Sequence, residues 1–491
     1  MNLKLLAKDT AIYGLSSIVG RFLNYLLVPL YTYKIAAESG GYGIVTNLYA
    51  YTALLLTLLT FGMETTMFRF SNKDGEDSRK VYGTILWFVI GIGVAFLLLV
   101  FAFLSPLSAA MGYSTHPEYI GCMAIIVAMD ALQAMMFSHL RLEHRPVRFM
   151  ALKFAFIIPS ILLNLFIFLV MPSMFGRFPA LEQLYVRFDY GVGLIFFVNL
   201  ICTTLVFTGF VSELKGLRCA PDRKLLKRFL GYSWPIVILS LVGNLNQVAD
   251  KILYPHLMPG HDGMVQLGIY GACVKIAMIM SLLTQAFRYA YEPIVFNGSR
   301  DRNNPSTLAD GMKYFIVFTL AAFLAVVVYM PVIRHIIQPG YWPALGTVPI
   351  VMAAEIFMGI YFNLSFWYKL TDQTWWGAVI SLCGAVVMIA VNVLLVPVIG
   401  YWACAWGGFA GYGTAMLMSY FLGCRKYPIP YDLRCIGKFA LTAVVLYACH
   451  IGLTRCGLPV WAQVLAGTVL LGLYLLMVYK SLISVRLKKT V

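Results

Sequence analysis

Apolar runs of about 20 residues recur along the whole chain and constrain its fold more than any other feature. At 1.5 Å of rise per residue, a helix of about 20 apolar residues crosses the roughly 30 Å hydrocarbon core of a bilayer. Of the 491 residues, 60% are apolar and only 12% are charged, whereas soluble domains are nearly half apolar and a quarter charged. The sequence therefore predicts an all-α polytopic membrane protein and excludes an ordinary soluble enzyme.

Fourteen such runs are separated by charged or Pro- and Gly-rich breaks. The predicted spans are approximately 10–33, 43–66, 81–104, 119–140, 150–171, 190–211, 229–254, 268–290, 312–331, 347–368, 374–396, 402–422, 436–454 and 461–484. An even number of spans places both termini on one side of the membrane.

The distribution of basic residues indicates on which side of the membrane the termini lie. Most of the 37 Lys and Arg residues fall at the N-terminus, in the connections that follow even-numbered spans, and at the end of the chain. By the positive-inside rule, both termini are expected in the cytoplasm, with the chain multi-pass in a bacterial inner membrane. The same placement accounts for the net charge of +16 without nucleic acid, because anionic lipids attract these residues.

An internal repeat organises the spans. Tyr42-Gly43 is followed 228 residues later by Tyr270-Gly271, and the same offset carries Glu64 onto Glu292. The repeat predicts two pseudo-symmetric six-helix lobes in the same orientation, with substrate between them. The expected divisions are an N-lobe over 1–211, a cytoplasmic linker over 212–228, a C-lobe over 229–422, an added helix pair over 436–484 and a basic tail over 485–491.

Motifs for soluble catalysis are absent from the sequence. It contains no GxxxxGK[ST] phosphate loop, and its ten cysteines include no CxxC pair. The pairs His139/His144 and His256/His261 have no matching Cys or acidic cluster and are interpreted as loop or interface histidines. No catalytic residue, metal site or organic cofactor is therefore predicted, and the chain is expected to be a transporter rather than an enzyme.

Charges inside the spans are the candidate functional residues, because a charge at mid-membrane costs at least ~2.5 kcal/mol unless a partner or water compensates it. Arg21, Asp130 and Glu355 fall near the centres of their predicted spans. Lys251 and Lys275 lie nearer the periplasmic ends, where snorkelling and lining a cavity are both open. The remaining candidates, at cytoplasmic ends where capping is the alternative to gating, are Glu64, Arg288 and Glu292.

The chemistry of these side chains indicates an anionic substrate. Arg21 carries a guanidinium, which stays protonated and makes forked hydrogen bonds to phosphate. Asp130 and Glu355 occupy equivalent repeat positions and are the candidates for coupling to H⁺ or Na⁺, whereas Glu64 and Glu292 are gate candidates.

Several strings resemble a known family. They are Leu6-Ala7-Lys8-Asp9-Thr10-Ala11-Ile12-Tyr13-Gly14, Gly20-Arg21, Phe61-Gly62-Met63-Glu64 and Gln285-Ala286-Phe287-Arg288-Tyr289-Ala290-Tyr291-Glu292-Pro293. Spans 1 to 12 are similar to the polysaccharide transporters, or O-antigen flippases, of the multidrug/oligosaccharidyl-lipid/polysaccharide (MOP, MATE-like) exporter superfamily.

The resemblance implies alternating access by two lobes. It further implies that an undecaprenyl-diphosphate-linked oligosaccharide is flipped to the periplasmic leaflet for O-antigen of lipopolysaccharide, capsule or exopolysaccharide. The expected partners are this lipid-linked substrate, a polysaccharide polymerase and glycosyltransferases. Arg21, Lys251 and Arg288 carry over to the family's diphosphate-binding cavity residues, and Lys275 joins them as a substrate-binding candidate.

Three other functions stay open at this point. An ion-coupled multidrug or metabolite antiporter on the same fold would use Asp130 and Glu355 but is disfavoured by Arg21 and Lys275. A major-facilitator transporter is disfavoured because the connection after span 2 lacks that family's Gly-Asp-Arg-Gly-Arg-like motif. A scaffold or polymerase is disfavoured because the longest periplasmic stretch, 172–189, is short for catalysis.

Overall fold

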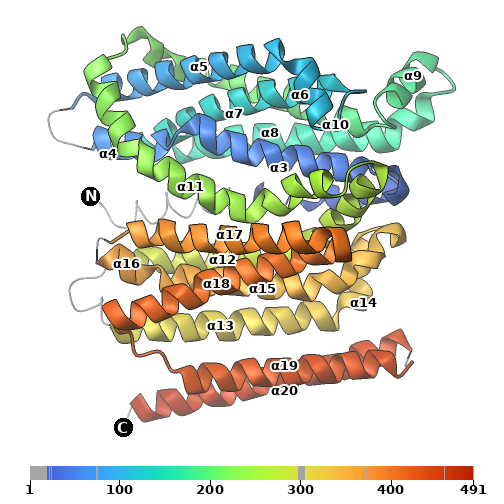
Figure 1. Cartoon of the computed structure of the whole chain (residues 1–491), viewed down its shortest axis with the longest axis vertical. Helices are drawn as coiled ribbons and strands as arrows, with labels where there is room; N and C mark the ends of the chain where they lie inside the picture. The colour runs from blue at the N-terminus through green and yellow to red at the C-terminus, as the bar shows by residue number, and fades with distance from the viewer. Residues whose placement is uncertain are drawn as a thin grey trace. The chain divides into compact units, whose positions relative to one another are not determined.

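The computed structural model describes residues 19–20, 23, 25–72, 76–296, 305–371, 373–457 and 459–489. Every regular element within these residues is helical, which confirms the predicted all-α class (Figure 1). Twelve helices in the described part of the chain are long and apolar enough to cross a membrane. The chain is therefore a multi-span membrane protein.

Within the described residues, the N-terminal half contains eleven α-helices and several short turns of other helix types. Their bounds are α2 Leu27–Lys34, η1 Ala37–Ser39, α3 Gly41–Thr60, α4 Met63–Ser71, α5 Ser78–Ala102, α6 Leu104–Ala110, α7 Pro117–Leu142, α8 Pro146–Leu165, η2 Phe166–Val170, η3 Met171–Met174, α9 Pro179–Arg187, α10 Val192–Gly209, η4 Glu213–Arg218, α11 Arg223–Leu257 and α12 His261–Phe296.

The C-terminal half continues in the same way. Its bounds are α13 Pro305–Val328, α14 Met330–Ile333, η5 Arg334–Ile336, η6 Pro339–Thr347, α15 Val348–Leu364, α16 Phe366–Leu370, α17 Trp375–Ile399, α18 Trp402–Lys426, α19 Leu433–Arg455 and α20 Val460–Lys489.

Two predicted spans are not among these twelve helices. Half of the span expected over 10–33 lies outside the described residues, and its end is the short helix α2. The span expected over 402–422 is helix α18, whose glycines and aromatic residues lower its mean hydropathy. Those glycines allow close packing on α17: a Cβ added to Gly411 would lie 2.8 Å from the carbonyl oxygen of Gly384. The low hydropathy of α18 thus follows from tight helix packing.

The span predicted as one helix over 43–66 is broken in the structure. Phe61 and Gly62 have positive φ angles of 48° and 64°, so α3 ends and α4 begins in a new direction. The ring of Phe61 packs on Phe88 at 5.8 Å and on Trp234 at 6.5 Å between centroids. This packing holds a phenylalanine in a conformation that glycine usually adopts.

Asp side chains begin three of the long helices. Asp77 caps α5, Asp222 caps α11 and Asp432 caps α19, each by accepting a backbone N–H of the first turn. Such caps satisfy donors that no carbonyl within the helix can reach. Hydrogen bonds from Leu225 N and Lys224 N to its carboxylate lower the pKa of Asp222 below its usual value.

The chain forms two compact units, divided after Gly271. In unit 1, α3 packs on α7 and α11, and α5, α8 and α10 surround α7 (Figure 1). A cluster of buried methionine and aromatic side chains, including Met63, Met135 and Phe229, lies among α4, α5, α7 and α11. The predicted lobe boundaries, with a linker over 212–228, stay a prediction.

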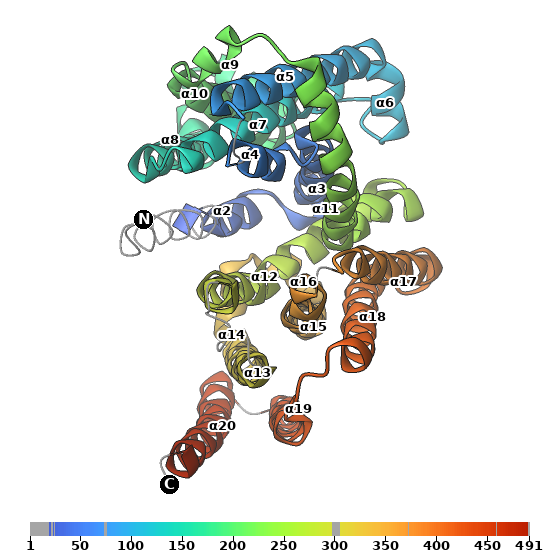
Figure 2. The same cartoon turned by 90° about the vertical axis from the view of Figure 1, so that its left-hand side faces the viewer.

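Unit 2 is built around α13, α15, α17 and α18. Figure 2 shows α19 and α20, the predicted added pair, beside α13. Phe439 and the fully buried Tyr474 join that contact, and the Tyr474 hydroxyl donates to the carbonyl oxygen of Val317 at 3.3 Å. The added helices therefore dock on α13 through apolar packing that includes a buried hydrogen bond.

Candidate functional site

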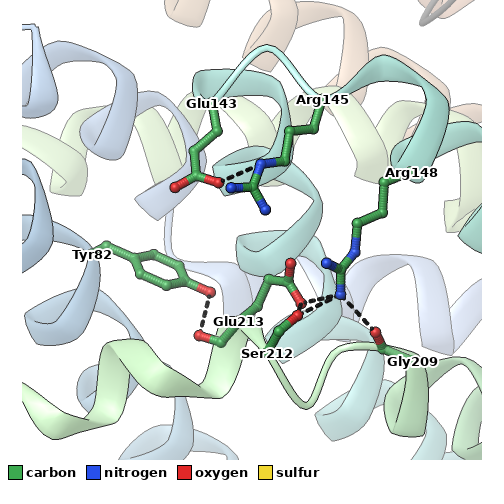
Figure 3. Close-up of polar contacts among 7 residues, drawn as sticks. All are labelled: Tyr82, Glu143, Arg145, Arg148, Gly209, Ser212 and Glu213. Carbon is green, nitrogen blue, oxygen red and sulfur yellow. Dashed lines mark hydrogen bonds and ion pairs between the residues drawn. The ribbon is translucent and has the colours of Figure 1, made fainter.

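The ends of the unit 1 helices near residues 76–77, 143–145 and 210–222, here named the basic end, hold a polar cluster (Figure 3). Arg148 on α8 donates to the Glu213 carboxylate at 2.9 Å and to the Gly209 carbonyl oxygen at 3.1 Å. The Ser212 hydroxyl and the Tyr82 hydroxyl also donate to Glu213, to its carboxylate and its carbonyl oxygen respectively. The Glu213 side chain is only 4% exposed. The contacts that Tyr82 and Arg148 make with Glu213 and Gly209 join α5, α8 and α10.

The gate candidate Glu64 lies at the same end. It stands in the first turn of α4, directly after the break at Phe61 and Gly62. Its carboxylate accepts hydrogen bonds from Arg141 at 2.8 Å and from the Ser138 hydroxyl at 3.2 Å. The broken helix thus aims Glu64 at α7, and the resulting ion pair is about two-fifths exposed.

Lys251 takes part in a network at the other end of unit 1. Its ammonium lies 2.9 and 3.0 Å from the two carboxylate oxygens of Asp250, which is 7% exposed. The Tyr270 hydroxyl donates to the same carboxylate at 3.1 Å. Asn47 donates to the Lys251 carbonyl oxygen and accepts from the Tyr113 hydroxyl, both at 2.8 Å. Helices α3, α11 and α12 therefore meet in a polar network that compensates the lysine charge.

Asp130 lies near the middle of α7 and is half-buried. The side chains of Lys153 on α8 and Thr203 on α10 are its polar neighbours. The Lys153 ammonium also lies 4.1 Å from the centre of the Phe137 ring. Sequence reasoning did not single out Lys153, although the span predicted over 150–171 contains it. The proline at 146, a residue type that begins helices, was the available sign that Lys153 stands two turns inside α8.

In unit 2, Arg288 on α12 is exposed, and its guanidinium lies 4.8 Å from the centre of the Phe362 ring. The ammonium of Lys369, which the sequence did not single out, lies 4.7 Å from the same ring. Lys275 on α12 and Glu355 on α15 are both half-buried. Two cations thus contact one aromatic ring, and such contacts stabilise positive charge.

Two candidates cannot be placed as side chains. Arg21 lies outside the described residues, and Glu292 lies in α12 in a stretch for which the backbone alone is described. Asp130 belongs to unit 1 and Glu355 to unit 2, and their role in ion coupling stays a prediction.

The histidines have ordinary polar partners. His139 lies 3.5 Å from the Glu143 carboxylate, and His256 is hydrogen-bonded to the Tyr51 hydroxyl at 2.9 Å. Among the described residues, no group of three or more His, Cys, Asp or Glu side chains is arranged to hold a metal ion.

The sequence of residues 6–294 matches the family model described as polysaccharide biosynthesis protein. The match covers more than half of the 491 residues. The chain belongs to this polysaccharide biosynthesis protein family. The resemblance first noted at Gly20-Arg21 and around Glu292 falls inside the matched range, so the predicted family is confirmed. No curated protein matches the sequence closely enough to count as a relative.

Several solved membrane transporters have a similar fold. A lipid II flippase, MurJ, in an inward closed conformation aligns with a TM-score of 0.70 at 13% identity, covering 96% of this chain and 99% of MurJ. An inward-facing multidrug resistance MATE transporter of the MOP superfamily gives 0.63 at 13% identity, over 82% and 93%. The MATE multidrug transporter DinF-BH gives 0.59 at 16% identity, over 87% and 96%. This member of the polysaccharide biosynthesis family therefore has the MOP transporter fold.

Proposed function

We propose that this protein flips an undecaprenyl-diphosphate-linked oligosaccharide from the cytoplasmic to the periplasmic leaflet of a bacterial inner membrane. The product would feed assembly of O-antigen, capsule or exopolysaccharide by a polymerase, after glycosyltransferases have built the unit. The family match over 6–294 carries the proposal, because it joins polysaccharide biosynthesis to a transporter fold. The similarity to a lipid II flippase over 96% of the chain supports a lipid-linked substrate.

The distribution of charge supports the proposed orientation of the protein in the membrane. Basic residues gather in the connections after even-numbered spans, so the basic end of unit 1 and both termini are assigned to the cytoplasm. The opposite end, which includes the connection between α11 and α12, then faces the periplasm. Substrate made in the cytoplasm would enter where cations are most abundant.

The proposed mechanism separates three parts of the substrate. Cationic side chains hold the diphosphate, with Arg21 as the main candidate and Lys251, Lys275 and Arg288 as further ones. The lobes alternate in access while the polyprenyl tail stays in lipid and the glycan crosses between them. An H⁺ or Na⁺ gradient acting on the two central carboxylates, Asp130 and Glu355, would drive the cycle.

The test is a sidedness assay in liposomes containing the purified protein. A fluorescent undecaprenyl-diphosphate oligosaccharide is added, and a membrane-impermeant quencher reports how much label remains outside. We expect faster exchange than in protein-free liposomes, abolished in Arg21→Ala and partly kept in Arg21→Lys. Arg434→Ala, an exposed arginine at the start of α19, is the matched control and should flip normally. No exchange with several glycans would overturn the proposal.

An ion-coupled multidrug or metabolite antiporter is the second candidate function. Asp130 favours it, because a half-buried carboxylate in the middle of a helix suits a lipophilic cation or a coupling proton. The fold shared with multidrug MATE transporters is compatible with it. Drug efflux that disappears in Asp130→Asn, without glycolipid flipping, would establish this function instead.

A further inference from the structure

Unit 1 contains a cavity of about 800 Å³ at the end opposite the basic end. Sites that bury most of a small organic ligand measure roughly 300 to 1,000 Å³, so the cavity has the size of a binding pocket. Its walls come from the end of α2, the connections before α7 and α10, and the start of α12. All the lining residues belong to unit 1.

One part of the wall is a connected polar group. His116 places one ring nitrogen 3.0 Å from the Glu118 carboxylate and the other 3.4 Å from the Asp189 carboxylate. Tyr119 stacks on the His116 ring at 4.8 Å between centroids, and its hydroxyl donates to Asp189 at 2.8 Å. Each of these polar groups is therefore held in position before any ligand arrives.

An adjoining part of the wall is a strained turn. Asp189, Tyr190 and Gly191 have consecutive positive φ angles of 50°, 53° and 95°. A Cβ added to Gly191 would lie 2.7 Å from the Tyr185 ring, so that ring packs directly on the turn. Two successive side chains in the left-handed region cost energy that the surrounding contacts must repay. The turn sets the Asp189 carboxylate and the Tyr190 ring, which is 65% exposed, at the cavity.

The charge and side-chain chemistry of the cavity lining favour one class of ligand. Among the described residues that line the cavity directly, Lys34 and Asp189 carry opposite formal charges, with histidine counted as neutral, and Glu118 contacts the lining residue His116. Tyr113, Tyr119, Tyr185 and Tyr190 supply rings and hydroxyls, and burial raises the pKa of the Tyr185 hydroxyl, which keeps it neutral. The described residues hold no metal-ligand set here or elsewhere. Such walls favour a neutral, hydroxyl-rich molecule with an apolar face.

A saccharide fits this description. The C–H face of a sugar ring packs on an aromatic ring, and its hydroxyls exchange hydrogen bonds with carboxylate, imidazole and phenol groups. We propose that this cavity binds the sugar units of the transported glycan after they reach the periplasmic side. The choice of a saccharide as ligand rests on the proposed flippase function. The cavity would be a second binding site, which contacts the glycan rather than the diphosphate.

The test uses sugars without lipid or phosphate. Chitotriose, mannotriose and maltotriose are each added to the full-length protein in nanodiscs, and saturation-transfer NMR measures contact and affinity. We expect transfer to the ring protons of at least one trisaccharide. Tyr190→Ala should weaken that affinity about five-fold, as expected for loss of one aromatic contact. Asp189→Asn should weaken it further. Tyr479→Ala removes a tyrosine of similar exposure, 63%, on α20 and should change nothing.

Each alternative outcome has a defined meaning. The saccharide site is refuted if none of the three sugars shows transfer, or if Tyr190→Ala binds as tightly as the wild type. Binding of tetraphenylphosphonium that Asp189→Asn abolishes would assign the cavity to lipophilic cations and also refute it. The sidedness assay separates the two proposals. If trisaccharides bind through Tyr190 but the protein flips no glycolipid, the flippase proposal is overturned and the saccharide site stands. If the protein flips glycolipid but Tyr190→Ala binds trisaccharides as tightly as the wild type, the site is refuted and the flippase proposal stands.

Discussion

The buried ion pair at the basic end gives the most direct test of the structure. Glu213→Gln keeps the shape of the side chain but removes the charge that Arg148 contacts at 2.9 Å. Breaking a fully buried pair costs about 3–5 kcal/mol. Here the carboxylate is 4% exposed but the guanidinium is 35% exposed, so water recovers part of that loss. We expect a loss of about 2 kcal/mol, close to the range for hydrogen bonds to charged groups.

Thermal unfolding of the full-length protein in detergent measures this effect. A fluorescent maleimide reports unfolding as it reaches buried cysteines such as Cys122 and Cys202 of unit 1. At roughly 2–4 °C per kcal/mol, Glu213→Gln should lower Tm by about 4–8 °C. Arg145 provides the matched control, because its separate pair with Glu143, also at the basic end, is 53% and 37% exposed (Figure 3). Arg145→Ala should cost under about 1 kcal/mol.

A double-mutant cycle tests whether the loss of stability comes from the interaction between Glu213 and Arg148. If Glu213 and Arg148 act together, Glu213→Gln combined with Arg148→Gln should cost clearly less than the sum of the two single changes. Additive shifts in Tm would mean that each side chain stabilises the fold independently. A shift for Glu213→Gln no larger than that for Arg145→Ala would refute the assigned role of burial.

Three further predictions follow from other contacts. Gly43→Ala should reduce the yield of folded protein sharply, since its Cβ would collide with the Met264 carbonyl oxygen; Gly91→Ala, with no atom within 4 Å, should express normally. The pKa of Asp222 is lowered, so the stability that its cap gives α11 is fully present above pH about 4 and is lost as pH falls through the lowered pKa. In Asp222→Ala, unfolding stability measured against pH should no longer show this decrease in acid. Asp250→Ala should lower Tm by the equivalent of about 3 kcal/mol, because it leaves the adjacent lysine ammonium, 18% exposed, without its carboxylate; an unchanged Tm would show that the network is dispensable.

Helix positions could be predicted from the sequence because they depend on local composition. Apolar length fixes where a chain can span a bilayer, and charged breaks fix where it turns. The break at Phe61 could not be predicted in this way. A phenylalanine with φ of 48° is stable only against Phe88 and Trp234, which are brought there by other helices. Long-range packing therefore decided the shape of this predicted span.

Candidate residues could be found from the sequence, but their partners could not. A charge within an apolar run is visible without a structure, which is how Asp130 and Lys251 were found. Asp250 adjoins Lys251 in sequence, yet the hydrogen bond that joins Tyr270 to the pair depends on how α11 and α12 cross. The pocket at Asp189 had no sequence signal, because its residues come from four separate segments that look like ordinary loops and helix ends.

The ion-pair partners of the arginines at the basic end limit how many of these arginines are available to bind an anion. Counting basic residues treats every arginine there as available to anionic lipid or to a diphosphate. In the structure, Arg141, Arg148 and Arg228 lie within 3 Å of Glu64, Glu213 and Glu76 respectively. Each of these pairs joins two separate segments of unit 1, so these arginines hold the basic end together before any substrate is present. In the proposed mechanism, binding of the diphosphate would therefore rely on cations other than Arg141, Arg148 and Arg228.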